Sequence, residues 1–155
     1  MTATDGTFLV THADEGSATL RDVTNAQVFT LSKNPGVEAG EVVEGVLEPE
    51  PPMEVTYEVA SLRDQRTIPV ERADLEPTTQ AKELAADQPV GELTTRERAG
   101  EGELHVLTVE EDGADAAAAE VIEDEATVSR AARLGVDRVE IRTASGVVSV
   151  RYLPD

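Results

Sequence analysis

Apolar and polar residues alternate in the stretch from Met53 to Val59. Because successive side chains of a strand point to opposite faces, this pattern predicts a half-buried strand with Met53, Val55, Tyr57 and Val59 facing inward. We expect this strand to cover residues 53–62. Its water-facing side carries glutamate rather than lysine, and the same preference recurs along the chain.

Four further β-rich segments precede this one, and the first two flank a turn at Gly16 as in a hairpin. The fourth segment has apolar residues on both faces, which is typical of a strand in a small closed barrel. The prolines after it, Pro49, Pro51 and Pro52, are expected to break strand pairing. The four expected strands are residues 7–12, 17–23, 27–32 and 41–47. Five short strands with a longer loop after the third favour a small Greek-key barrel.

The first part of the chain also resembles the OB barrels and the related TRAM modules. The resemblance rests on a glycine-containing first hairpin, a Val-Phe strand and a Pro/Gly-Glu turn in that order, carried by Gly16, Val28, Phe29, Pro35, Gly40, Glu41 and Tyr57. Members of those families usually bind RNA or single-stranded DNA through basic grooves and exposed aromatic residues. Residues 1–59, however, hold 11 acids and only two bases, Arg21 and Lys33. The resemblance therefore implies the fold more than the ligand.

A change of organisation is expected in residues 63–78, which form a linker or an edge strand around Ile68 to Val70. Pro77 marks the expected boundary between two domains. We expect an OB-like β-barrel domain of residues 1–76 and an α+β domain of residues 77–155, so that the whole chain is mostly β.

The second domain is predicted to be a ββαββ unit, an antiparallel sheet with one main helix on one face. A short helix precedes it, and Gly135 is expected to cap the main helix at its C-terminus. The expected elements are a helix at 78–87, strands at 91–98 and 103–109, the main helix at 113–134, and strands at 138–143 and 147–153. The expected inward residues of the last hairpin are Val139, Ile141, Val148, Val150 and Tyr152. A break of the main helix near Asp124 into two helices is the alternative.

The chain is strongly acidic, with 32 acids, 13 bases and a formal net charge of -19. Only Lys33 and Lys82 are lysines, and the other bases are arginines. Such self-repulsion is screened over ~10 Å at 0.1 M salt and ~3 Å at 1 M, which favours a salt-rich cytoplasm. The alternative is an ordinary acidic protein that repels nucleic acid. As a whole, the composition and layout resemble an uncharacterised family of acidic haloarchaeal proteins, and no activity is implied by that resemblance.

Several classes of site are not expected. Cysteine is absent, so neither disulfides nor thiolate metal sites can form. No signal peptide and no apolar run approaching ~20 residues is present, so we expect a soluble cytoplasmic protein with no membrane partner. Neither common phosphate-binding glycine loop appears, nor a serine nucleophile elbow, and no cofactor is expected.

Two groups of residues are possible metal ligands. The only histidines, His12 and His105, fall in different predicted strands and domains and are interpreted as ordinary strand residues. Residues 101–125 hold ten acids and no base, and the run EEDGAD at 110–115 is either a cation site or the solvated face of a helix. The spacing does not fit the EF-hand pattern, which favours the solvated face.

Arginines are concentrated near the C-terminus, where they could form a basic patch. The candidate residues are Arg130, Arg133, Arg138, Arg142 and Arg151, and a second concentration comprises Arg63, Arg66, Arg72, Arg96 and Arg98. Guanidinium groups bind phosphates and carboxylates alike. The patch is therefore either a contact for RNA or, as we favour, a set of intramolecular pairs with the preceding acidic run.

Without a catalytic signature, the chain is predicted to be a non-catalytic binding or adaptor module in a complex with protein or RNA. A DNA partner is not expected. The alternatives are an enzyme that acts on a small substrate at the domain junction, and a purely structural subunit.

Overall fold

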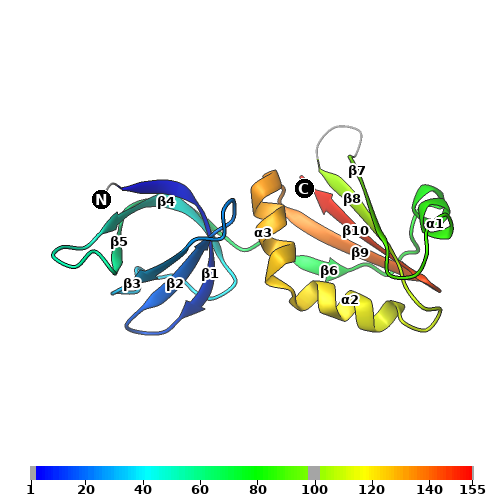
Figure 1. The fold of residues 1–155 in the computed structure, drawn as a ribbon, viewed down its shortest axis with the longest axis horizontal. Coiled ribbons are helices and arrows are strands. Elements are labelled where there is room, and N and C mark those ends of the chain that lie inside the picture. Colours follow the sequence, from blue (N-terminus) through cyan, green and yellow to red (C-terminus); the bar gives the residue numbers. More distant parts are fainter. Residues whose placement is uncertain (1–2, 98–101, 155) are drawn as a thin grey trace. The chain divides into compact units, whose positions relative to one another are not determined.

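A computed structural model describes residues 3–97 and 102–154 of the chain (Figure 1). The chain forms two compact units. The first contains the residues up to Ile68 together with Val128–Arg133, and the second contains Pro69–Thr127 and the residues from Leu134 onward. That residues 1–76 and 77–155 fold as separate domains stays a prediction.

The first unit is a closed barrel of five strands, which confirms the expected small OB-like barrel (Figure 1). The strands are β1 (Thr4–Ala13), β2 (Ala18–Asp22), β3 (Val28–Leu31), β4 (Val42–Pro49) and β5 (Tyr57–Arg66). Around the barrel they follow the order β1-β2-β3-β5-β4, and antiparallel pairing of β1 with β4 closes it. Within the barrel, β3 and β5 pair in parallel.

Three aromatic rings form the centre of the barrel. Phe29 contacts Phe8 and Tyr57 edge to face, with ring centroids 5.5 Å and 4.9 Å apart. Edge-to-face contacts of this kind add to the free energy gained by burial. The barrel therefore concentrates three of the chain's four aromatic residues in one core.

Gly45 lets β4 and β5 approach closely. The pairing of these strands shifts register on either side of this glycine, between Glu44 and Gly45 and again between Val46 and Leu47. A Cβ atom at position 45 would collide with the carbonyl oxygen of Ser61 on β5. Only glycine fits here without a shift of the backbone.

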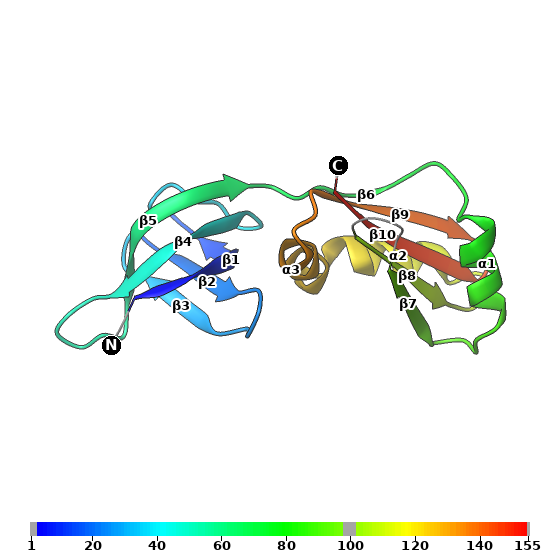
Figure 2. The ribbon, with the colours of Figure 1, turned by 90° about the horizontal axis from the view of Figure 1, so that it is seen from above.

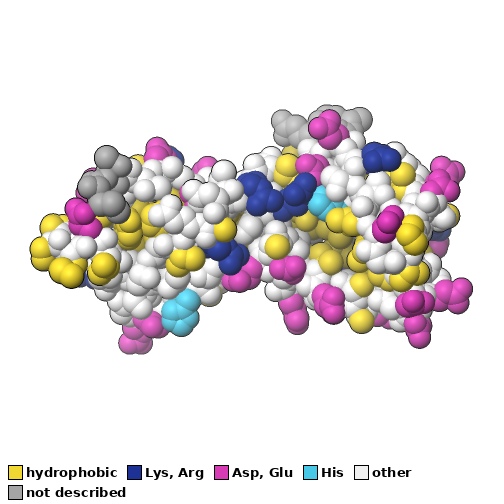
Figure 3. Space-filling view, in the orientation of Figure 1, with side chains coloured by type: hydrophobic (Ala, Val, Ile, Leu, Met, Phe, Trp, Pro, Cys, Tyr) yellow, Lys and Arg dark blue, Asp and Glu magenta, His cyan; other side chains and the backbone are white. Residues whose placement is uncertain are grey.

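The alternation that predicted a strand from residue 53 was misleading. Met53 and Val55 are 74% and 71% exposed, and β5 begins only at Tyr57. Glu54 has φ +58, and its N–H donates to the carbonyl of Glu50 at 2.9 Å. The chain thus forms a local turn here instead of a strand, because its backbone groups find their hydrogen-bond partners within the turn. Figure 3 shows the resulting cluster of apolar side chains at the tip of the β4–β5 loop.

The second unit contains a sheet with helices, as predicted for an α+β domain, but the sheet has five strands where the ββαββ prediction gave four. Its order is β6 (Val70–Arg72), β9 (Arg138–Ala144), β10 (Val147–Leu153), β8 (Glu103–Thr108) and β7 (Leu93–Glu97). All neighbours are antiparallel except β6 and β9. The segment around residue 70 is therefore an edge strand, and it belongs to the second sheet. The turn expected between β7 and β8 falls largely on residues 98–101, outside the described residues.

The expected main helix is two helices, α2 (Ala114–Glu123) and α3 (Glu125–Leu134), so the alternative break at Asp124 is correct. Asp124 is extended (ψ 120), and its carboxylate accepts from the N–H of Ala126 at 2.9 Å. An aspartate in this position is a favourable N-cap, so it starts a new helix rather than continuing the old one. Gly135 follows α3 with φ +73, as a C-terminal cap requires.

Helices cover both faces of the second sheet, whereas one face was expected (Figures 1 and 2). Residues of β6, β9 and β10 contact α2, on the face that buries the five predicted inward residues. The short helix α1 (Thr79–Ala86) packs Ala81 and Ala85 against Leu104, Val106 and Val147 on the other face. Since α1 has only 8 residues, it covers only part of that face.

No helix within residues 3–97 and 102–154 is long and apolar enough to span a bilayer.

Candidate functional site

The face of the second sheet that α1 covers in part carries a row of charged side chains. One residue from each strand lies in register across it, in the order Glu71, Glu140, Arg151, Leu104 and Arg96. Directly paired residues share a face of the sheet. Arg138 and Arg142 lie two positions on either side of Glu140, so they share the same face. We call this surface, with Arg96, Arg138, Arg142 and Arg151, the arginine face.

Glu140 is the centre of an ion-pair cluster on the arginine face. Its carboxylate accepts from Nε of Arg142 at 2.7 Å and from Nη1 of Arg151 at 2.9 Å. Nη1 of Arg138 lies 3.6 Å away. The side chain of Glu140 is 15% exposed, so the central pairs are only partly solvated. One carboxylate thus holds three guanidinium groups in place.

The cluster perturbs the titration of Glu140. Burial raises the pKa of this carboxyl, but the hydrogen bonds and charges of Arg142 and Arg151 outweigh that effect and leave the pKa below its ordinary value of 4.5. Glu140 is therefore ionised at neutral pH. The arginine face holds four arginines against two glutamates, Glu71 and Glu140, and so has an excess of positive charge, while the chain as a whole carries -19.

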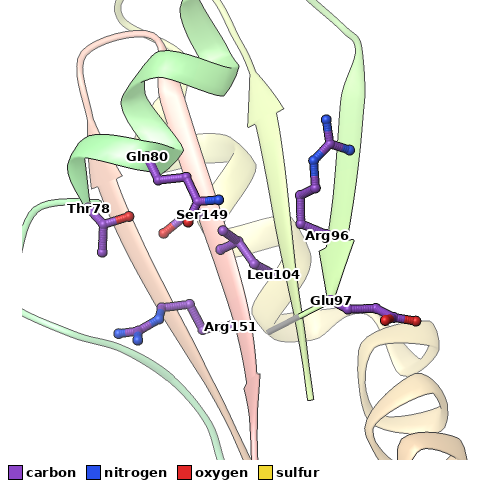
Figure 4. Close-up of a pocket in the computed structure, with 7 residues that line it drawn as sticks. All are labelled: Thr78, Gln80, Arg96, Glu97, Leu104, Ser149 and Arg151. Carbon is purple, nitrogen blue, oxygen red and sulfur yellow. The ribbon is translucent and has the colours of Figure 1, made fainter. Parts of the chain in front are cut away.

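A cavity of about 320 Å³ opens on the arginine face beside the start of α1 (Figure 4). We call it the α1 pocket. Its lining residues are Thr78, Gln80, Arg96, Glu97, Leu104, Ser149 and Arg151. Figure 4 shows Gln80 reaching from α1 toward Ser149 on β10, while the side chain of Glu97 points away from both.

The floor of the α1 pocket contains a hydroxyl group with unused hydrogen-bonding capacity. Ser149 is 1% exposed, and its Oγ has no hydrogen-bond partner among the described residues. Leaving a buried polar group unsatisfied costs roughly 1–3 kcal/mol. Ser129 on α3 is the other buried hydroxyl without a partner in the described part of the chain. Ser149 is the one of the two that lines the α1 pocket.

The start of α1 is electropositive. Thr78 caps the helix, and its side chain accepts from the N–H of Ala81 at 3.2 Å. The first turn holds no acidic residue, whereas α2 has Asp115 and α3 has Glu125 in that position. Acids usually occupy the first turn because they offset the positive end of the helix dipole. The first turn of α1 therefore supplies no carboxylate to offset that positive end.

The predicted basic patch is divided between the two units. Arg138, Arg142 and Arg151 meet at Glu140, as described above. Arg130 and Arg133 lie on α3 in the part counted with the first unit, where Nη1 of Arg133 donates to the carbonyl of Val23 at 2.9 Å. That all five arginines act as one patch stays a prediction.

The second concentration of arginines also contains internal pairs. Arg63 pairs with Asp5 at 2.6 Å, and Arg66 with Asp64 at 3.6 Å. Arg72 pairs with Asp115 of the acidic run at 2.5 Å and is an example of the intramolecular pairing we favoured. Arg96 lies on the arginine face, and Arg98 falls outside the described residues.

The possible metal ligands do not gather into a site. His12 is exposed and lies 3.5 Å from Asp14, and buried His105 contacts Glu103 at 3.0 Å. Within the described ranges, no three carboxylate or imidazole side chains are placed to hold a metal ion. The acidic side chains of α2 and the loop before it point into solvent on the face seen in Figure 3.

Sequence reasoning named the four arginines of this face among its candidates but missed the role of Glu140, Ser149, Thr78 and Gln80. The alternating run Arg138-Val-Glu140-Ile-Arg142 already places both arginines beside Glu140 on one strand face, so that signal was available. Ser149 is a polar residue within the apolar run at 147–150, so its unusual position was also visible in the sequence. The contribution of Thr78 and Gln80 could not be found, because it depends on where α1 packs.

Comparisons with known proteins give one match. No curated protein and no solved structure matches the chain. The family described as a family of unknown function (DUF5812) matches residues 4–143, which include the barrel, β6, β7, β8 and most of β9, and three of the four arginines of the arginine face. The chain therefore belongs to this family of unknown function, DUF5812.

Proposed function

We propose that the protein is a non-catalytic protein-binding module of a salt-rich cytoplasm, and that it holds its partner on the arginine face. The observation that carries this proposal is the gathering of four of the 13 bases on one sheet face beside a cavity. In a chain with a net charge of -19, such a face attracts an acidic partner segment while the rest of the surface repels it.

Two observations favour a protein partner over RNA. The four aromatic residues, Phe8, Phe29, Tyr57 and Tyr152, are all buried, so none of them offers a base-stacking surface. The net charge also repels a phosphate backbone along most of its length. A short acidic peptide segment needs only the arginine face, whereas a nucleic acid strand extends beyond it.

Affinity capture from a lysate of the source cells in molar KCl tests this proposal. Arg96→Glu reverses one exposed charge of the arginine face and leaves the Glu140 cluster intact. Lys33→Glu makes the same change of charge on the barrel and serves as the matched control. We expect the unaltered protein and Lys33→Glu to retain the same protein partner, and Arg96→Glu to lose it.

Three outcomes would contradict the proposal. The first is that no partner is retained by the unaltered protein. The second is that RNA is retained and nuclease treatment removes every bound protein. The third is that all three forms retain the partner equally, which would show that the arginine face is not the contact. An enzyme acting on a small substrate, the alternative raised by the sequence, stays a prediction.

A further inference from the structure

The α1 pocket combines two features that each favour a negatively charged group. The first turn of α1 presents N–H groups that lack helical acceptors, and no acidic residue offsets their positive charge. Arg151 lines the same pocket. A helix start with an adjacent guanidinium group is a common arrangement for binding phosphates and carboxylates.

Ser149 supplies an observation independent of the helix. Its hydroxyl is buried, has no partner within the described residues, and lines the pocket from β10. A serine hydroxyl can donate one hydrogen bond to an anion. Gln80 is exposed and reaches toward Ser149 in Figure 4, so its side chain must swing aside before a ligand contacts the hydroxyl. Exposed side chains change rotamer on the nanosecond timescale, so this cover is not a barrier.

Arg151 can serve the pocket without leaving its cluster. Glu140 accepts from only one of its nitrogen atoms, Nη1 at 2.9 Å. A guanidinium group has five N–H donors, so others remain for a ligand. The pairing with Glu140 also restricts the side chain, which lowers the entropy lost when a ligand binds.

We propose that the α1 pocket binds an oxyanion group, either a phosphate or a carboxylate, through the first turn of α1, Ser149 Oγ and Arg151. The proposal builds on the proposed function, since the group would belong to the partner held on the arginine face or to a small molecule that occupies the same place. The volume of about 320 Å³ accommodates such a group together with a few further atoms.

Titration of the full chain with inorganic phosphate, and separately with acetate, tests the proposal without any partner. Amide NMR signals are followed at constant KCl concentration. We expect saturable shifts centred on Gln80, Ser149 and Arg151, with a Kd on the order of 1 mM, equivalent to about 4 kcal/mol. A response to phosphate alone identifies a phosphate site, and a response to acetate identifies a carboxylate site.

Ser149→Ala is the decisive variant because the hydroxyl it removes has no partner to lose. We expect it to unfold at the same temperature as the unaltered protein or higher, and to bind the anion about tenfold more weakly, as expected for the loss of a hydrogen bond to a charged group. Ser129→Ala removes the other buried hydroxyl without a partner in the described residues and should leave anion binding unchanged.

The proposal is overturned if neither anion causes saturable shifts up to about 100 mM, roughly a hundred times the expected Kd. It is also overturned if Ser149→Ala binds as tightly as the unaltered protein. Anion binding without any captured protein would refute the protein-binding function and leave the pocket assignment standing. A partner captured equally by Ser149→Ala, with no anion binding, would refute the pocket assignment alone.

Discussion

The replacement Glu140→Gln tests whether the ion-pair cluster stabilises the second unit. Glutamine keeps the size of the side chain and one acceptor oxygen, but it removes the charge that three guanidinium groups share. The replacement abolishes the ion pairs of 2.7 Å with Arg142, 2.9 Å with Arg151 and 3.6 Å with Arg138. Three positive groups would then face one another without the carboxylate that they all contact.

The burial of the cluster sets the expected magnitude. Exposed ion pairs contribute roughly 0.2–1 kcal/mol, whereas removing one member of a buried pair costs roughly 3–5 kcal/mol. Glu140, Arg142 and Arg151 have side chains that are 15%, 16% and 20% exposed, which places the cluster between these limits. We expect Glu140→Gln to lower the free energy of unfolding of the second unit by about 2 kcal/mol, and its midpoint by roughly 10 °C.

Thermal unfolding followed by the amide NMR signals of β9 and β10 measures the effect in the second unit. Glu71→Gln is the matched control, since Glu71 is exposed and lies directly opposite Glu140 on the same face. Removing this like charge should leave the midpoint unchanged or raise it slightly. The reasoning fails if Glu140→Gln melts within about 1 °C of the unaltered protein, or if Glu71→Gln lowers the melting midpoint as much as Glu140→Gln does.

The pH dependence provides an independent check. Because the pKa of Glu140 is lowered in the folded protein, its ionised form stabilises the fold. This contribution is fully present above the ordinary pKa of 4.5 and is lost as the pH falls through the lower folded value. The difference in midpoint between the unaltered protein and Glu140→Gln should therefore be constant above that range and shrink below it. A difference that does not change with acidification would contradict the assigned ion pairs.

Three further predictions concern the barrel and the charge of the chain. Gly45→Ala should destabilise the barrel by about 2–3 kcal/mol in urea unfolding, because the added Cβ meets the carbonyl of Ser61. The control Gly16→Ala adds a Cβ that meets nothing closer than ordinary van der Waals contact, and it should change the free energy of unfolding by less than about 0.5 kcal/mol. Equal effects would refute the close approach of β4 and β5. Asn34→Ala should lower the free energy of unfolding by about 2 kcal/mol, because the Asn34 side chain makes hydrogen bonds with Asp14, Gly36 and Val37. The control Asn25→Ala removes one such bond, to Gln27, and should lower the free energy of unfolding clearly less. The opposite order in urea unfolding would show that the loop does not depend on Asn34. Raising KCl from about 0.1 M to about 1 M should raise the melting midpoint of the protein substantially, because the length over which acidic side chains repel one another falls from ~10 Å to ~3 Å. Equal midpoints at the two concentrations would contradict adaptation to salt.

Local signals in the sequence were sufficient for most of the secondary structure. Thr78 begins α1 and Gly135 follows α3, because capping depends on the chemistry of a few consecutive residues. The hairpin of β9 and β10 follows from its alternation, and its predicted inward residues are buried. The pattern failed at Met53 and Val55, where alternation is compatible with a loop as well as with a strand.

The sequence by itself determined the barrel, the second sheet and the acidic character of the surface, since periodicity, turn residues and charge are properties of the chain. Only the tertiary structure decided that Glu140 gathers three arginines, because one of them, Arg151, comes from the neighbouring strand. It also decided that Ser149 lies buried without a partner among the described residues beside α1. Both depend on strand register and on where a short helix packs, which are settled by the balance of many distant contacts rather than by local sequence.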